Sequence, residues 1–216
     1  MLSLSEKYRP RTLDEVIGQD KAVTQARRLL ESGCGGRAVY IAGPTGSGKT
    51  TVARILAGTL ADEWLTMEYD SADDFKADEV ERLRDSMGLL GTGKGGRAWI
   101  INEAHGLRAP VIRQLLGIIE RLPNHCLLVF TTTDEGSAML FDGIDARPLV
   151  SRCWRIDFSS YGVQDAFARR CMEIARVEHL DGQPIGAYKA LAKRCMGSMR
   201  AMLAEIEAGA MKGGAA

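Results

Sequence analysis

The sequence predicts an α/β fold in which a five-stranded parallel sheet, covered by helices, is followed by a small all-helical unit. Up to about residue 158, short apolar or β-branched runs alternate with helical patterns, as is typical of a parallel sheet covered on both faces. From about residue 159 only helical patterns follow. The third observation is a glycine-rich loop at 43–50, between the first strand and its helix.

Each expected strand is a short apolar run bounded by polar or glycine-rich sequence. The expected strands are 37–42, 65–69, 98–101, 126–130 and 153–158. Helical patterns lie between them. The expected helices are one from Asp20, as its N-cap, to a stop at Gly33, then 51–57, 76–87 and 110–122. Residues 4–19 show no long periodicity and are expected to be extended, and the glycines of 91–96 are expected to form a mobile connector.

Three further helices are expected in the C-terminal part, because apolar residues recur there at helical spacing. The first stripe is Val163, Phe167, Cys171, Ile174 and Ala175, the second is Ala187, Ala190 and Leu191, and the third, capped by Ser198, is Met199, Met202, Leu203 and Ile206. We therefore expect an α/β domain at 1–158, a helical domain at 159–210 and a flexible tail at 211–216.

Composition narrows the classes of protein. Lys plus Arg and Asp plus Glu both number 28, so any nucleic-acid binding would come from a local patch or from helix N-termini. The N-terminus lacks an apolar run of signal-peptide length, and no run is long enough to cross a membrane, which favours the cytoplasm. The five cysteines contain no C-x-x-C pair, so buried free thiols are expected and a zinc site is not.

The loop at 43–50 fits the pattern G-x-x-x-x-G-K-[ST]. Its residues are Gly43, Pro44, Thr45, Gly46, Ser47, Gly48, Lys49 and Thr50, with Thr51 next in the helix. Glycines let backbone N–H groups approach an anion, and a helix N-terminus adds partial positive charge. Lys49 can then reach the β- and γ-phosphates while the Thr50 hydroxyl ligates Mg²⁺. With a strand before it and a helix after it, this loop predicts binding of a nucleoside triphosphate with Mg²⁺ rather than a chance glycine-rich turn.

Hydrolysis would need further groups at the ends of neighbouring strands. Glu103 is the candidate that polarises water, and Asn102 stands where an Asp is expected to hold the Mg²⁺ shell. An amide oxygen can accept a hydrogen bond there but brings no charge, so ATP binding is expected to be secure and hydrolysis less so. Thr132 could contact the γ-phosphate, or simply belong to a β-forming threonine run.

Two arginines complete the candidates. Arg152 precedes the last expected strand, and judged alone it would be an ordinary solvated charge. Arg200 lies at a helix start, where a cation is mildly unfavourable, so an anionic partner is plausible for it.

Together these motifs resemble the AAA+ clamp-loader ATPases, including the motor subunit of the bacterial DNA polymerase III clamp loader and the replication factor C small subunits. The segment Glu6–Gln19 is similar to the opening box of that family. The resemblance implies that this box lies beside the adenine, through Tyr8, Arg9, Val16 and Ile17. Residues 102–105 resemble the Walker B motif with Asp changed to Asn, and 127–134 the sensor 1 strand, with Thr131, Thr132 and Thr133 as alternatives for the sensor.

Two more motifs carry the resemblance. Ser151-Arg152-Cys153 matches the most distinctive short motif of the family, which implies that Arg152 is an arginine finger acting on the ATP of a neighbouring subunit. Gly197-Ser198-Met199-Arg200 is similar to the sensor 2 motif of the helical lid, so Arg200 is implied to act on the ATP of its own chain. The resemblance covers roughly residues 4–207.

Two departures from the family are visible. Residues 57–66 leave no room for the zinc insert of the bacterial motor subunit, and the sequence ends after the lid, without the family's helical collar. The resemblance implies a clamp-loader-like ATPase whose partners are neighbouring AAA+ subunits, a sliding clamp and primer–template DNA, without a membrane. Two alternatives stay open: an ATP-binding structural or regulatory subunit that does not hydrolyse ATP, and another AAA+ DNA motor, such as a branch-migration motor.

Overall fold

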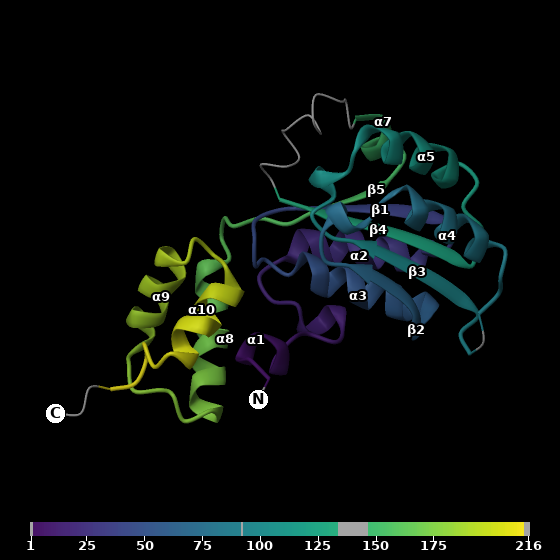
Figure 1. Ribbon diagram of the computed structural model, residues 1–216. Coiled ribbons are helices and arrows are strands. Elements are labelled where there is room, and N and C mark those ends of the chain that lie inside the picture. The colour runs from purple at the N-terminus through teal and green to yellow at the C-terminus, as the bar shows by residue number, and fades with distance from the viewer. Residues whose placement is uncertain (1, 92, 134–146, 214–216) are drawn as a thin grey trace.

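The computed structural model describes residues 2–91, 93–133 and 147–213. Its centre is one sheet of five parallel strands (Figure 1). The strands are β1 Arg37–Ala42, β2 Ala61–Tyr69, β3 Gly96–Ile101, β4 Cys126–Thr132 and β5 Trp154–Asp157. They lie in the order β2-β3-β4-β1-β5, and every neighbouring pair is parallel. The predicted fold class is confirmed.

Helices cover both faces of this sheet (Figure 1). On one face lie α2 Asp20–Glu31 and α3 Lys49–Leu60, and on the other lie α4 Ala77–Met87 and α5 Ala109–Ile119. Among the described residues, short 3-10 turns occur at Leu13–Glu15, Ala72–Asp74 and Ala104–Gly106, and a one-turn helix, α7, spans Arg147–Val150.

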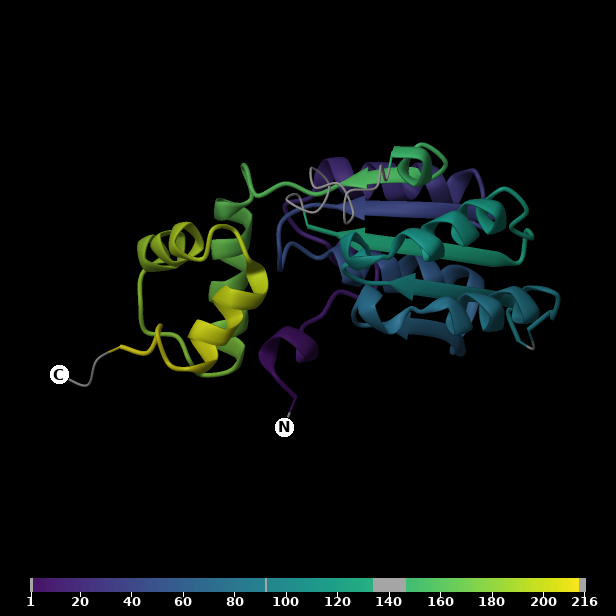
Figure 2. The same ribbon diagram turned by 45° about the horizontal axis from the view of Figure 1, so that its top comes forward.

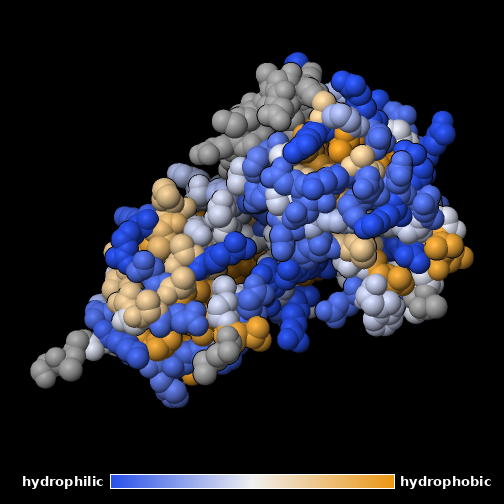
Figure 3. Space-filling model, viewed as in Figure 1, coloured by the Kyte–Doolittle hydropathy of each residue, from blue (hydrophilic) through white to orange (hydrophobic). Residues whose placement is uncertain are grey.

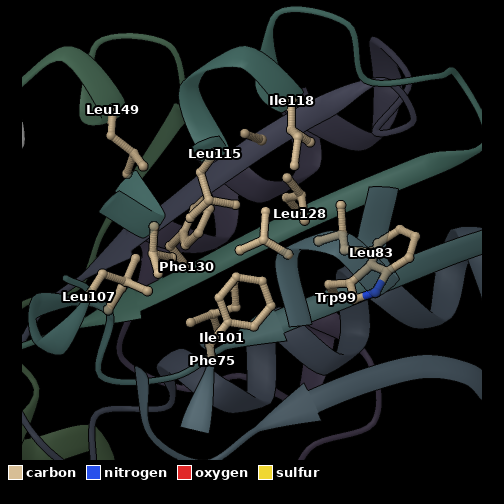
Figure 4. Close-up of a cluster of buried hydrophobic side chains, with 14 of the residues drawn as sticks. Phe75, Leu83, Trp99, Ile101, Leu107, Leu115, Ile118, Leu128, Phe130 and Leu149 are labelled. Carbon is tan, nitrogen blue, oxygen red and sulfur yellow. The ribbon is translucent and has the colours of Figure 1, made fainter. Parts of the chain in front are cut away.

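The alternation of side chains along the strands divides the core into two layers. In β1, Val39 and Ile41 pack under α2 and α3, while Tyr40 faces the layer under α4 and α5. Figure 4 shows that second layer, in which Phe75, Trp99, Phe130 and their aliphatic neighbours fill the space between the sheet and its helices. Because both faces are buried, β3 and β4 consist almost entirely of buried residues.

After β5 the chain forms a separate group of helices, α8 Gln164–Val177, α9 Ile185–Arg194 and α10 Met199–Glu207 (Figures 1 and 2). Their apolar stripes meet in a third buried cluster, but Ala190 of the predicted second stripe is exposed, and Tyr188 is buried in the cluster instead. The short helix α1 Leu4–Lys7 lies against them, and Leu4 is 5% exposed within their cluster. In Figure 2 the N-terminus accordingly lies beside the lower end of this helical group.

Several local expectations differ from the structure. Residues 4–19 are not simply extended, because α1 is held by its contacts with α10 and a 3-10 turn follows at Leu13–Glu15. Asp20 is the first helical residue, and Gln19 takes the N-cap position while its side chain bonds to the backbone of Ser159. The helix α5 ends at Ile119.

The structure also lengthens β2 and α3. The strand β2 begins at Ala61, directly after α3, although Asp62 and Glu63 are acidic and the pairing of β2 with β3 is irregular between Ala61 and Thr66. The one-turn helix α7 has no periodic signal in the sequence. Met1, Thr92 of the expected mobile connector, Asp134 of the sensor 1 match and 214–216 of the expected tail lie outside the described residues.

Within the described ranges, no helix has both the length and the hydropathy needed to cross a bilayer. The space-filling view shows a largely hydrophilic face over the α/β part (Figure 3). The five cysteines are free, and burial raises the pKa of Cys126 to about 11 and those of Cys153 and Cys171 to about 12. The thiols of Cys126, Cys153 and Cys171 therefore stay protonated near neutral pH.

Candidate nucleotide-binding site

The candidate residues gather at the carboxyl edge of the sheet because the strands that carry them are parallel and in register. Ala42, the last residue of β1, pairs with Thr132 of β4, and Ile101 of β3 pairs with Phe130. The loop after β1 and the residue after β3 are therefore brought to the same edge as the end of β4.

The loop at 43–50 has the backbone that its glycines predict. Gly48 occupies the N-cap of α3 with φ of 110°, and Gly46 has φ of 73°, both in a region that L side chains rarely adopt. The Lys49 side chain is buried, and its Nζ donates hydrogen bonds to the carbonyl oxygens of Gly43 and Pro44 at 2.8 and 2.9 Å. The lysine is thus held inside the loop that phosphates would enter.

Asn102 lies at the centre of a hydrogen-bond cluster and is 6% exposed. Its Oδ1 accepts hydrogen bonds from the hydroxyls of Thr50 and Thr131, both at 2.9 Å. Its Nδ2 donates to Glu68 Oε1 and to the carbonyl of Tyr69, both at 3.1 Å. The amide therefore connects the loop at 43–50 (the P-loop) with β4 and β2.

Glu68 is in turn paired with Arg54 of α3. Arg54 Nε and a terminal guanidinium nitrogen donate to its two carboxylate oxygens at 2.7 and 3.0 Å. This hydrogen-bonded partner raises the pKa of Arg54. The sequence motifs did not predict Glu68 as a site residue. For Arg54 the only signal in the sequence is its position one helical turn after Thr50.

The residues Thr50 and Asn102 fit a magnesium ion. Because the Thr50 hydroxyl donates its proton to Asn102 Oδ1, its oxygen lone pairs are left for a metal. Mg²⁺ prefers oxygen ligands and keeps several of its waters, so few protein ligands are needed.

Glu103 follows Asn102 with a backbone that an L residue seldom adopts, φ of 50°. Such a conformation costs about 1–3 kcal/mol and concentrates at functional sites. It leaves the carboxylate half-exposed, with Oε2 3.4 Å from His105 Nδ1. The same ring nitrogen lies 3.3 Å from the hydroxyl of the buried Thr132. His105, which was not a predicted site residue, thus connects Glu103 with the end of β4.

A cavity of about 120 Å³ lies between the P-loop, the N-terminal segment and the helical group. Arg9, Arg170 and Arg200 line it, together with Gly46, Ser47, Gly48 and Thr51 of the P-loop region. Its apolar wall includes Phe167, Ile174, Met199 and Leu203. The cavity therefore joins a cationic, glycine-rich end to an apolar one.

The P-loop touches the start of α10 directly. The Met199 N–H donates to the Gly46 carbonyl at 3.1 Å, and the Ser198 side chain caps α10 by accepting from Ala201 N. The Arg9 hydrogen bond lowers the pKa of Glu6, and the charge of the exposed Arg200 acts in the same direction. Arg200 therefore lies beside the N-terminal segment and the P-loop at once.

The four residues of the N-terminal box are not equivalent. Tyr8, Arg9 and Ile17 line the cavity, whereas Val16 packs against the layer under α2 and α3. The Tyr8 hydroxyl donates to Glu178, which follows α8, and Arg9 donates to Thr51 Oγ1 at 3.2 Å. This segment connects the helical group to α3.

Arg152 lies away from the cavity. It precedes β5, whose Trp154 pairs with Val39 near the start of β1, so it is at the opposite edge of the sheet from the P-loop. Because a strand rises about 3.3 Å per residue, the distance between Arg152 and the P-loop along the strands is on the order of 15 Å. Its Nε donates to Glu120 at the end of α5 at 2.9 Å. Arg152 therefore does not reach the cavity of its own chain.

Comparison with known proteins agrees with this geometry. Residues 39–159 match the model of the ATPase family associated with various cellular activities (AAA). The chain belongs to this AAA family. The match covers the P-loop, Asn102-Glu103 and all of β4 and β5.

The relatives of this AAA chain include DNA replication proteins, and the predicted resemblance to the clamp-loader ATPases is confirmed. Subunit tau of Bacillus subtilis DNA polymerase III is 25% identical over 230 aligned positions, which cover 95% of this chain and 39% of the relative. The large subunit of replication factor C from Methanosarcina mazei is 37% identical over 134 positions, 58% of this chain and 22% of the relative. The chain thus spans less than half the length of either relative.

Solved structures show the same fold. A variant of Thermotoga maritima RuvB has a TM-score of 0.73 at 24% identity, over 93% of this AAA chain and 64% of the other. A second variant of that protein has a TM-score of 0.72.

Proposed function

We propose that this AAA chain binds ATP with Mg²⁺ between its P-loop and a helical lid, which is the group of helices α8, α9 and α10. The chain hydrolyses ATP together with a neighbouring subunit, and it uses this cycle to load a sliding clamp on primed DNA. The observation that carries the proposal is the cavity that the P-loop shares with three arginines and the lid. The names of the polymerase III and replication factor C relatives support the replication context.

The contacts at the site and the lining of the cavity support each proposed role. Lys49 and the P-loop amides hold the phosphates, Thr50 and Asn102 hold the metal, and the aromatic ring of Tyr8 with Ile17 faces the base. When bound, Mg²⁺ neutralises charge on the phosphates. Arg200 senses the γ-phosphate from the lid of the same chain.

Glu103 activates the attacking water, with Thr132 and His105 beside it. Water attacks the terminal phosphorus, the bond to the bridging oxygen breaks, and ADP leaves. A general base contributes about 10²–10⁴-fold, so Glu103→Gln should lower kcat by about 10²-fold or more while ATP affinity stays within twofold. Steady-state turnover and equilibrium ATP binding measure the two, and equal turnover in both proteins would remove Glu103 from this role.

Arg152 completes the site of a neighbouring subunit. Its position near the amino ends of the strands, away from the P-loop of its own chain, supports this role. The proposed domain division, 1–158 and 159–210 with a tail at 211–216, gives each subunit one core and one lid. Met211 of the expected tail is 5% exposed and packs in the buried cluster of α8, α9 and α10, so the lid includes it.

The test of the proposal is ATP binding and turnover by the wild type and Lys49→Ala, with and without primed DNA and a sliding clamp. We expect tight binding that Lys49→Ala loses and turnover that primed DNA with a clamp increases. Equal ATP binding by Lys49→Ala would contradict the proposal.

A second candidate, an ATP-gated structural subunit, is favoured by the amide at Asn102, which carries no charge of its own. Intact ATP binding with turnover no higher than that of Lys49→Ala would support it. Stimulation by four-way junctions but not by primed DNA would instead indicate a branch-migration motor.

A further inference from the structure

The structure assigns to Glu68 a role in the metal site: we infer that it is a positioning residue that orients the Asn102 amide and supplies, one strand away, the negative charge that Asn102 lacks. This inference rests on the proposed binding of ATP with Mg²⁺. It concerns residues of β2, α3 and the end of β3, which converge beside the P-loop.

The orientation of the Asn102 amide is determined by its partners. On one side it meets a carboxylate oxygen of Glu68 and the Tyr69 carbonyl, which only accept hydrogen bonds, so the NH₂ group belongs there. The carbonyl oxygen must then face the hydroxyls of Thr50 and Thr131. Glu68 thereby turns an oxygen toward the proposed metal ligand Thr50.

The contacts close into a ring. Thr50 donates to Asn102, Asn102 donates to Glu68, and Glu68 accepts from Arg54, which lies four residues after Thr50 on the same face of α3. A ring that begins and ends on one helix fixes the end of β2 and the end of β3 relative to the P-loop. It also holds Glu68, whose side chain is 20% exposed, by both of its oxygens.

The charge of the ring has a consequence for metal binding. Asn102 and Glu68 together carry one negative charge, as a single Asp at position 102 with a neutral neighbour would. If Glu68 became neutral, Arg54 would lose its hydrogen-bonded counter-charge, although the charges of Glu6 and Asp70 would still act on it, and the site would carry one negative charge fewer beside the metal position. A dication should then bind more weakly, because the attraction between opposite charges would be smaller.

The same geometry gives Asn102→Asp an effect opposite to simple repair of the Walker B motif. An aspartate would place a carboxylate against Glu68 and the Tyr69 carbonyl, with no N–H for either. The double variant Asn102→Asp/Glu68→Gln restores a donor, since the introduced glutamine amide can donate to the introduced aspartate. The pair then again carries one negative charge.

The experiment measures Mn²⁺ affinity by electron paramagnetic resonance at saturating ATP, ATP affinity in EDTA, and thermal unfolding without ligand. We expect Glu68→Gln to weaken Mn²⁺ binding by about tenfold, the lower end of what loss of such an outer-shell partner costs, with ATP affinity in EDTA within twofold of wild type. Glu63→Gln, at an exposed carboxylate of the same strand, is the matched control and should bind Mn²⁺ as the wild type does.

The double variant provides the rescue. Asn102→Asp alone should lower the unfolding temperature, and adding Glu68→Gln should raise it again and return Mn²⁺ affinity to within about threefold of wild type. The inference is overturned if Glu68→Gln binds Mn²⁺ like Glu63→Gln, or if the double variant binds it no more tightly than Glu68→Gln. Failure of the wild type to bind ATP even with Mn²⁺ would instead overturn the proposed function, and this inference with it.

Discussion

Gly46 shows most clearly how a single residue joins the phosphate loop to the lid. Its φ of 73° excludes most side chains, and a Cβ added there would lie 2.0 Å from Ser198 Oγ. The sequence motif explains the glycine by close approach of phosphate, whereas the structure adds contact with the start of α10 as a second reason. The residue therefore lies in the phosphate loop and also in its contact with the start of α10.

We predict that Gly46→Ala separates the lid from the P-loop. Overpacking of this kind costs about 1–3 kcal/mol, so ATP affinity should fall by about 5- to 150-fold. Equilibrium binding of a fluorescent ATP analogue measures the effect.

Two variants interpret that result. Gly33→Ala, with φ of 82° and nothing within 4 Å of the added Cβ, carries the backbone strain alone and should leave ATP affinity unchanged. Gly46→Ala/Ser198→Gly removes the clashing hydroxyl and should regain most of the affinity. Without that recovery, the contact with the lid would not be the reason for the glycine.

The residues that sequence reasoning found and missed differ in one physical respect. Lys49, Thr50 and Asn102 belong to short motifs whose spacing is local, and all three converge as predicted. Glu68 was missed because its contact with Asn102 joins residues 34 positions apart, and no local pattern records such a partner. Ser198 was predicted as the cap of α10, which its bond with Ala201 confirms, and only its close approach to Gly46 was missed.

At the scale of elements, the strands were the most predictable, because burial on both faces produces continuous apolar runs. The start of β2 was missed since its acidic residues lie at an irregular edge pairing. The helix α1 was missed because four residues carry no periodicity and it is stabilised by packing on α10.

The helix α10 depends on its first turn, where the sensor 2 candidate lies. Ser198 Oγ accepts from Ala201 N, so Ser198→Ala should lower the free energy of unfolding by about 0.5–2 kcal/mol. Urea denaturation measures it. Ser3, at the N-cap of α1 without a side-chain capping bond, is the matched site, and Ser3→Ala should cost less. An equal loss in the two variants would mean that the cap does not stabilise α10.

At the scale of the whole molecule, the N-terminal segment links the two parts of the chain. Leu4 packs within the buried cluster of α8, α9 and α10, and the Tyr8 hydroxyl donates a hydrogen bond to Glu178. Arg9 donates a hydrogen bond to Thr51 of α3. The boundary proposed at residue 159 therefore separates the sheet and its helices from α8, α9 and α10 along the sequence. The first residues of the chain nevertheless pack with the lid.

We predict that Leu4→Ala destabilises the protein by about 2–5 kcal/mol, as removal of a buried leucine side chain does. Leu2→Ala, at a side chain that is 71% exposed, should change stability by less than about 0.5 kcal/mol. Chemical denaturation of both variants decides the matter. If Leu4→Ala were as mild as Leu2→Ala, α1 would not be part of the lid.

In the proposed function, an ATP site is shared between subunits, with Lys49 from one chain and Arg152 from the next. The most direct test mixes Lys49→Ala with Arg152→Ala, each of which should be inactive alone because an arginine finger contributes about 10³–10⁵-fold. In the mixture, a Lys49→Ala chain can supply Arg152 to the intact P-loop of its neighbour, so ATP turnover should return and rise with protein concentration. A mixture as inactive as its components, beside a wild type that hydrolyses ATP, would contradict the shared site.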